Sequence, residues 1–185
     1  QTCALPIFSL QYTYLHRVLA DLKEKGFSFF HPEELDVKTK AWLRHYFEEQ
    51  IYPVVTPLAV DSGHPFPFLA NNTINAIVRI FQVQPDGTKD YKIAILPIPS
   101  VLDRIIEVPS SSNKVHRFVY LEDVISYYAI QFFQGYGIEE SMIFRLTRDA
   151  DLEIDEEDAK DLLTEVEASL RRRRRGDAVR LEVVG

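Results

Sequence analysis

The sequence predicts an α+β fold with a mainly antiparallel sheet and packed helices. Three observations indicate this class. Apolar residues recur at helical spacing in several segments, two β-rich runs flank a tight Asp86-Gly87 turn, and a proline-dense loop precedes those runs. With 185 residues, 46% of them hydrophobic, the chain can bury the core of one main domain, with room for part of a second.

The chain opens with a segment that does not fit the pattern after it. Residues 1–9 lack an initiating methionine and share no periodicity with the residues after them, so we interpret them as a non-native or unstructured start. Leu10 to Lys25 has apolar residues at helical spacing, and Gly26 stands where a helix would end. A helix with such a stripe needs an apolar partner.

The second helix is predicted from about Asp36 to Gln50 and ends before Pro53. Its apolar stripe comprises Trp42, Leu43, Tyr46, Phe47 and Ile51. The following stretch, Thr56 to Phe68, holds three prolines and one glycine, so it is predicted to be a stiff loop packed through Phe66, Phe68 and Leu69.

Strands dominate the middle of the chain. Thr73 to Ile80 and Tyr91 to Ile98 are predicted to pair as an antiparallel hairpin around the Asp86-Gly87 turn. Val115 to Tyr120 and Met142 to Thr147 are further strands, with a helix from about Glu122 to Phe133 between them.

The last predicted helix begins with the acidic run Asp155 to Asp158 and ends with Arg171 to Arg175, a charge order that suits the helix macrodipole. Its apolar stripe comprises Ala159, Leu162, Leu163, Val166 and Leu170. Gly176 ends it, and the alternating run Ala178 to Val184 is predicted to be a closing strand.

Composition excludes several functional classes. The net charge of −7 argues against nucleic-acid binding, and the single cysteine, Cys3, allows neither an internal disulfide nor a cysteine-based metal cage. No apolar run approaches the roughly 20 residues that span a bilayer. The sequence therefore predicts a soluble, cytosolic protein without a transmembrane segment.

The search for catalytic groups yields no nucleophile and no nucleotide cradle. The 7 glycines form no phosphate-binding loop, and the five histidines, His16, His31, His45, His64 and His116, lie too far apart for a metal-ligand pair. We predict no catalytic, cofactor-binding or metal-binding residue in this chain, and we favour a structural or solvent-facing role for each histidine.

Three features leave alternatives open. Arg171 to Arg175 is either a cationic helix end or a phosphate or polyanion site. Arg145 and Arg148, with Asp149 and Asp151, form either a structural network at a strand end or, less favourably, a metal site. The loop from His64 to Asn72 is either a domain or subunit contact or a simple cover for the core.

Five motifs follow one another along the chain. They are Trp42-Leu-Arg-His-Tyr-Phe47, Tyr52-Pro-Val-Val-Thr-Pro-Leu58, His64-Pro-Phe-Pro-Phe68, Arg145-Leu-Thr-Arg-Asp-Ala-Asp151 and Arg171-Arg-Arg-Arg-Arg-Gly-Asp-Ala-Val-Arg-Leu-Glu182. In this order they resemble the bacterial polyphosphate kinase family that works through a phosphohistidine, over roughly residues 10–185.

This resemblance implies a domain plan. Residues 10–26 are expected to be the last helix of an N-terminal helical domain, and residues 27–185 the head, or middle, domain. The C-terminal catalytic domains, which are similar to those of phospholipase D, are expected to be absent from this chain.

The resemblance also implies an activity. The family reversibly transfers the terminal phosphate of ATP to long-chain inorganic polyphosphate, with magnesium and a phosphorylated histidine that none of the five histidines here matches. The expected partners are the missing catalytic domains, polyphosphate, and a second copy bound through the head domain. The expected location is cytoplasmic, including the periphery of the inner membrane as part of a polyphosphate kinase complex.

We weigh two hypotheses for this piece. In the first, it is a structural, dimerisation and tunnel-lining part that is inactive alone and needs no ATP or magnesium of its own. In the second, it is an independent polyanion-binding module that uses Arg171 to Arg175. The candidates for contact with polyphosphate or with another domain are Arg145, Arg148, Arg171, Arg172, Arg173, Arg174 and Arg175.

Overall fold

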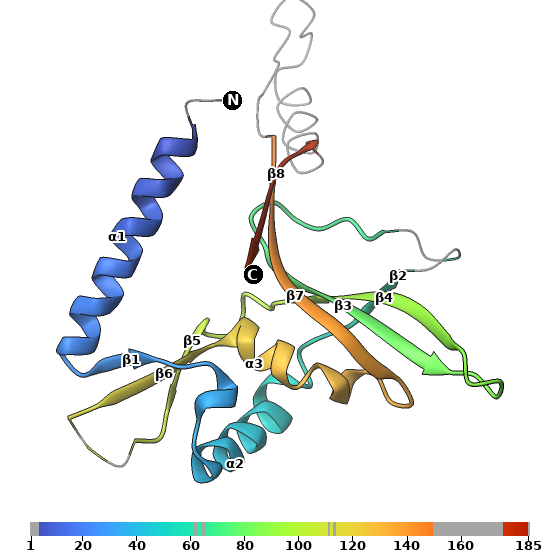
Figure 1. The fold of residues 1–185 in the computed structure, drawn as a ribbon, viewed down its shortest axis with the longest axis horizontal. Coiled ribbons are helices and arrows are strands. Elements are labelled where there is room, and N and C mark those ends of the chain that lie inside the picture. Colours follow the sequence, from blue (N-terminus) through green and yellow to red (C-terminus); the bar gives the residue numbers. More distant parts are fainter. Residues whose placement is uncertain are drawn as a thin grey trace, which may run out of the picture. The chain divides into compact units, whose positions relative to one another are not determined.

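The computed structural model describes residues 4–60, 63, 66–110, 112, 114–149 and 176–184. The fold is α+β with a mainly antiparallel sheet, as the sequence predicts (Figure 1). It consists of two compact units, which we describe one at a time. Unit 1 combines Gln1–Pro53 with Ser100–Tyr127, and unit 2 combines Val54–Pro99 with Tyr128–Gly185.

Unit 1 holds most of the helical structure around a small sheet. Its elements are α1 (Ala4–Glu24), β1 (Phe27–Phe29), the 3-10 helix η1 (Pro32–Glu34), α2 (Val37–Tyr46), the π-helix η2 (Phe47–Ile51), β5 (Ile105–Val108), β6 (His116–Tyr120) and α3 (Leu121–Tyr127). The strand order is β1-β6-β5, with β1 parallel and β5 antiparallel to β6. The short strand β5 was missed by the sequence-based prediction.

The N-terminal helix begins earlier than predicted. It starts at Ala4 rather than Leu10, so residues 4–9 are helical rather than unstructured. Gly26 follows the helix with a φ of 88° and accepts a hydrogen bond from the amide of His116 at 2.8 Å. The turn after α1 is thereby attached to β6.

The second helix owes its start to Asp36, whose side chain accepts a hydrogen bond from the amide of Thr39 at 2.9 Å. Arg117 also donates to Asp36 at 2.9 Å. These donors hold the pKa of the Asp36 carboxyl far below its usual range, with the Thr39 amide making the largest contribution. Leu43, Phe47 and Ile51 of the predicted stripe are fully buried, which confirms the core face of this helix.

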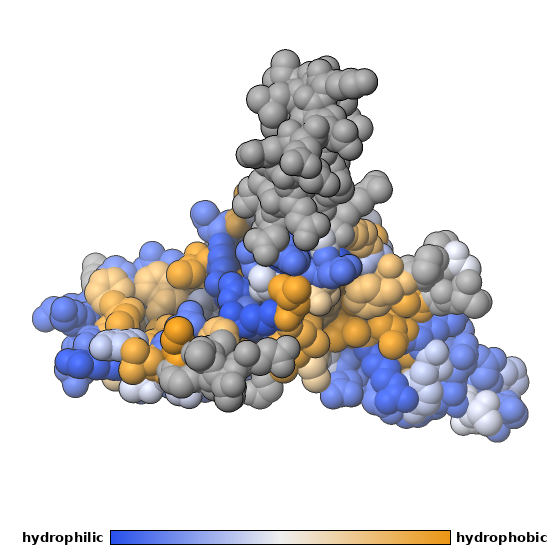
Figure 2. Space-filling model, turned by 90° about the horizontal axis from the view of Figure 1, so that it is seen from above, coloured by the Kyte–Doolittle hydropathy of each residue, from blue (hydrophilic) through white to orange (hydrophobic). Residues whose placement is uncertain are grey.

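Unit 2 is a five-stranded antiparallel sheet. Its elements are β2 (Leu58–Val60), β3 (Ile74–Val83), β4 (Lys89–Pro97), the 3-10 helix η3 (Ala129–Phe132), β7 (Gly137–Arg148) and β8 (Ala178–Val184), and the strand order is β2-β4-β3-β7-β8. The predicted hairpin is confirmed, with Phe81 opposite Tyr91. Its tip is hydrophilic, whereas apolar surface gathers nearer its base (Figure 2).

Three predictions for the segments around this sheet need correction. Leu58–Val60, inside the predicted loop from Thr56 to Phe68, forms the edge strand β2 and pairs with β4. The helix expected from Glu122 to Phe133 is interrupted after Tyr127, and a 3-10 helix follows it. In the proline-rich loop Leu69 is buried against Ile95 and Phe144, but Phe66 and Phe68 are each 56% exposed. These two aromatic rings are not buried in the core, and the Phe68 ring lies instead against the guanidinium of Arg148.

Some predicted features lie outside the described residues. They are the acidic helix start at Asp155, the helix after it, Arg171 to Arg175, Asp151 and His64. None of the helices in the described part of the chain combines the length and the apolarity needed to cross a membrane.

Candidate functional site

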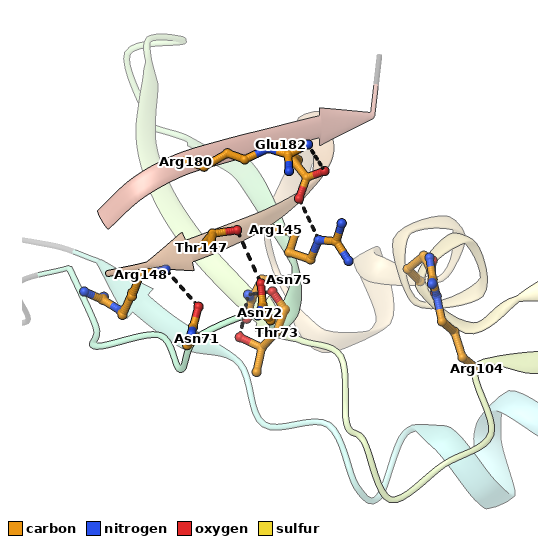
Figure 3. A network of polar contacts seen from close by, with 11 residues as sticks. Asn71, Asn72, Thr73, Asn75, Arg104, Arg145, Thr147, Arg148, Arg180 and Glu182 are labelled. Carbon is orange, nitrogen blue, oxygen red and sulfur yellow. Dashed lines mark hydrogen bonds and ion pairs between the residues drawn. The ribbon is translucent and has the colours of Figure 1, made fainter. Parts of the chain in front are cut away.

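The end of β7 brings together the predicted Arg145 and Arg148 with residues of β8 and of the loop before β3 (Figure 3). Arg145 lies opposite Glu182 in the β7–β8 ladder, and Thr147 lies opposite Arg180. Antiparallel pairing therefore places three guanidiniums, those of Arg145, Arg148 and Arg180, at one end of the sheet of unit 2.

The centre of this site is a carboxylate shared by two arginines. Arg145 Nε donates to Glu182 Oε2 at 2.8 Å, and Arg180 Nη2 donates to Glu182 Oε1 at 2.6 Å. The hydrogen bond from Arg145 is the main reason why the pKa of Glu182 lies below its usual value. Glu182 is 21% exposed, so its charge is partly shielded from water and holds both guanidiniums in place.

Arg148 binds the backbone rather than a carboxylate. Its Nε donates to the carbonyl of Leu69 at 2.9 Å, and its Nη1 donates to the carbonyl of Gly176 at 2.8 Å. The guanidinium also lies 4.1 Å from the centre of the Phe68 ring. Arg148 thus ties the proline-rich loop to the start of β8.

The sequence had favoured a network between Arg148 and the carboxylates of Asp149 or Asp151. The structural role is as predicted, but the two acceptors of the guanidinium are carbonyl oxygens. The amide of Asp149 donates to the carbonyl of Asp177 at 2.8 Å, so the backbone itself closes this end of the β7–β8 pair.

An asparagine-rich corner completes the site. Asn72 has a φ of 60°, and its amide donates to the carbonyl of Leu146 at 2.9 Å. Its side-chain oxygen accepts from Thr147 at 3.3 Å, and that of Asn71 accepts from the amide of Arg148 at 2.8 Å. Asparagine tolerates this left-handed conformation better than most residues, which explains why an asparagine suits position 72.

Asn71 and Asn72 belong to the candidate loop from His64 to Asn72, but sequence reasoning did not select the other residues of this network as candidates (Figure 3), namely Thr73, Asn75, Arg180 and Glu182. The alternation of residues 178–184 could have indicated that Arg180 and Glu182 share one face of a strand. Nothing in the sequence could have shown that Asn75, which is 1% exposed, donates to the carbonyl of Thr73. In residues 4–149 and 176–184, so far as they are described, the structure has no group of three or more side chains arranged to hold a metal ion.

Unit 1 contains an open cavity of about 480 Å³. Trp42, Glu107 and His116 are among its lining residues, and His116 Nδ1 lies 2.7 Å from Glu107 Oε1. Among the lining residues that the structure describes, Glu107 is the one permanently charged side chain, whereas a phosphate site requires surrounding positive charge.

Comparison with known proteins gives concordant results. The family model for the polyphosphate kinase middle domain matches residues 38–185. The chain is 41% identical to a polyphosphate kinase of Halalkalibacterium halodurans over 170 residues, which are 92% of this chain and 24% of that protein. It is 40% identical to a polyphosphate kinase of Bacillus cereus over 179 residues, or 96% of this chain and 25% of that protein.

The fold has a counterpart among solved structures. The crystal structure of polyphosphate kinase from Porphyromonas gingivalis matches with a TM-score of 0.65 and 24% sequence identity, over 85% of this chain and 26% of that one. The chain thus spans about a quarter of the length of the curated relatives it matches. On the family model and the identity to these relatives, the chain belongs to the polyphosphate kinase family, whose middle domain it contains.

Proposed function

We propose that this chain is the scaffold part of a polyphosphate kinase, an enzyme that reversibly transfers the terminal phosphate of ATP to long-chain inorganic polyphosphate through a phosphohistidine. In this proposal the parent enzyme uses ATP and magnesium, and both act in domains other than this one. The middle domain supports dimerisation and walls the path of the polyphosphate, and it is inactive alone.

The observation that carries this proposal is the use of the arginines at the end of β7. Arg145 shares Glu182 with Arg180, and Arg148 donates to the carbonyls of Leu69 and Gly176. Side chains engaged in this way hold strands and loops together. A phosphate chain that used these same donors would break hydrogen bonds that the fold already uses.

The exposed side of α1 supports the proposed domain plan. Leu10, Tyr14, Leu15 and Val18 are between 49% and 59% exposed, although they are the apolar stripe of a 21-residue helix. An amphipathic helix of this kind is stabilised by packing its stripe against a partner. We infer that other helices of a preceding domain in the parent enzyme cover it.

A domain exchange tests the proposed function. The segment of the Halalkalibacterium halodurans enzyme that aligns with this chain would be replaced by the 185-residue chain, and ATP-dependent polyphosphate synthesis would be measured with magnesium. We expect the chimera to retain synthesis, because a scaffold needs its fold and contacts rather than its own nucleophile. A folded chimera without synthesis would contradict the proposal.

The inactivity of the isolated chain needs a separate measurement. The purified 185-residue chain would be incubated with ATP, magnesium and polyphosphate, beside a mock preparation that controls for contaminating kinases. We expect turnover equal to that of the mock preparation. Turnover above it would show that the chain itself contains a phosphotransfer site.

A further inference from the structure

The strand β8 occupies an edge of the sheet in unit 2. Among the strands that the structure describes, β8 has one neighbour, β7, and β8 is the last strand in the order of the sheet. An edge strand presents a row of backbone donors and acceptors on its outer side, which can pair with another strand. Seven residues, Ala178–Val184, make this row long enough for such pairing.

One face of β8 is apolar and exposed. Val179 and Leu181 are each 62% exposed, and Val183 is 51% exposed. They lie on one face of the sheet, where Val183 is opposite Phe144 and Leu181 is opposite Leu146. The other face of β8 carries the charged Arg180 and Glu182, and a register irregularity lies at Thr147/Arg148 in its pairing with β7, two features that can protect an edge. The exposed apolar row is nevertheless the kind of surface that marks a contact.

The opposite face of β8 has a charge pattern that complements itself. Arg180 and Glu182 are separated by one residue, so both point to the face that carries Arg145. If two copies of β8 pair antiparallel about Leu181, Arg180 of each copy lies opposite Glu182 of the other. On the other face, Val179 of each copy then lies opposite Val183 of the other.

We propose that β8 is a self-complementary edge through which two copies of this chain join their sheets in antiparallel pairing about a two-fold axis at Leu181. This inference rests on the proposed function, since it assigns a surface to the dimerisation we propose there. The occupant of the edge is a second copy, because the arrangement of charged and apolar residues on β8 matches itself in this register.

Neighbouring registers do not provide this match. Centring the pair on Arg180 or on Glu182 places like charges opposite each other at the two-fold axis, which is destabilising. Shifting by a single residue brings the charged face of one copy beside the apolar face of the other. In the register centred on Leu181, each Glu182, which is bonded to Arg145 and Arg180 of its own chain, also lies opposite Arg180 of the other.

One strand pair gives a small interface, below the area buried in most stable complexes. We therefore expect an association that depends on protein concentration, measurable by sedimentation velocity across a dilution series of the 185-residue chain. Because two charge pairs contribute, we also expect the dimer to weaken as salt is raised.

Charge reversal tests the register. R180E and E182R each place like charges opposite one another twice in the dimer, and each is expected to weaken self-association about tenfold or more. An equimolar mixture of R180E and E182R chains restores opposite charges in both pairs and is expected to form a heterodimer. R79E, which breaks the Arg79–Glu139 pair on the central strand β3, is the matched control and is expected to dimerise like the unmodified chain.

A crosslinking experiment covers the case in which a charge variant fails to fold. In a C3S background, L181C brings two thiols together at the two-fold axis, at the separation of directly opposed residues in an antiparallel pair, which a disulfide can bridge. V183C is the control, because its thiols lie four residues out of register, about 13 Å along the strand. Mild oxidation is expected to link L181C chains and to leave V183C chains unlinked.

Each outcome decides between this inference and the broader proposal. If the unmodified chain dimerises but R180E, E182R and L181C behave like their controls, the edge assignment is wrong while dimerisation through another surface stands. If the unmodified chain stays monomeric at every concentration, the edge pairs with something else, such as further polypeptide of the parent enzyme. Both the inference and the dimerisation part of the proposed function are then overturned.

Discussion

Replacing Gly26 with alanine should destabilise unit 1 much more than the same change at Gly87 destabilises unit 2. Both glycines have positive φ values, 88° and 84°, so an alanine at either site costs about 1 kcal/mol of folding free energy for the backbone conformation. At Gly87 an added Cβ meets no atom within 4 Å, so this cost is the whole effect.

Gly26 carries a second cost. A Cβ at this position would lie 2.5 Å from the carbonyl oxygen of Lys114, a backbone atom just before β6 that cannot rotate away. Moving the backbone to relieve such overpacking costs about 1–3 kcal/mol. We therefore expect G26A to lose about 2–4 kcal/mol and G87A about 1 kcal/mol.

Urea unfolding monitored by far-ultraviolet circular dichroism measures both variants. The fluorescence of Trp42, the chain's one tryptophan, reports unit 1 separately. G26N and G87N separate the two costs, because asparagine adopts a left-handed backbone readily but still has a Cβ. G87N should be close to the unmodified chain, whereas G26N should remain destabilised. Equal losses in G26A and G87A would refute the reasoning about the Lys114 carbonyl.

Three further predictions concern charged groups. Because the donors from Thr39 and Arg117 lower the pKa of Asp36, its stabilising effect is present above the unfolded pKa of about 3.9 and is lost as the pH falls toward the folded value. The difference in stability between the chain and D36N should therefore be constant near neutral pH and shrink below about pH 4 in acid-unfolding titrations. R148A should cost about 1–3 kcal/mol of stability, and R148K should recover little of it, because a lysine cannot reach two carbonyls with a planar fork. If R148K were as stable as the unmodified chain in urea, the two hydrogen bonds of Arg148 would not be the stabilising contacts. The isolated chain should bind polyphosphate weakly at any salt concentration in fluorescence titrations. The polyanion-module hypothesis instead predicts tight binding that falls steeply with salt and disappears when Arg171 to Arg175 are replaced by alanine.

Most of the fold could be predicted because periodicity and turn chemistry act locally. The helix around Leu43 and the hairpin around Gly87 have patterns that are visible within a few residues. The β5 strand, Ile105–Val108, was missed because its four residues are too few to show alternation. The end of α3 at Tyr127 was missed because the apolar pattern continues into a 3-10 helix without a proline or glycine.

The site was harder to predict because its partners are distant in sequence. Arg145 meets Glu182 across 37 residues, and Arg148 meets Leu69 across 79. Periodicity could place Arg180 and Glu182 on one face of a strand, but only sheet order brings that strand to β7. Sequence reasoning identified Arg145 and Arg148 as important and assigned Arg148 the wrong acceptors.

The acceptors of Arg148 bear on how a phosphate chain could be handled near this domain. A guanidinium whose donors all face solvent can bind a phosphate at little cost. Arg148 already uses Nε and Nη1 on the carbonyls of Leu69 and Gly176, so a phosphate bound through these two donors would leave both carbonyls unpaired. Breaking these hydrogen bonds would also release the loop that covers Ile95 and Phe144. Contact of polyphosphate with the Nε and Nη1 donors of Arg148 would therefore weaken the fold that presents them, so loss of stability is the main effect to expect in R148K.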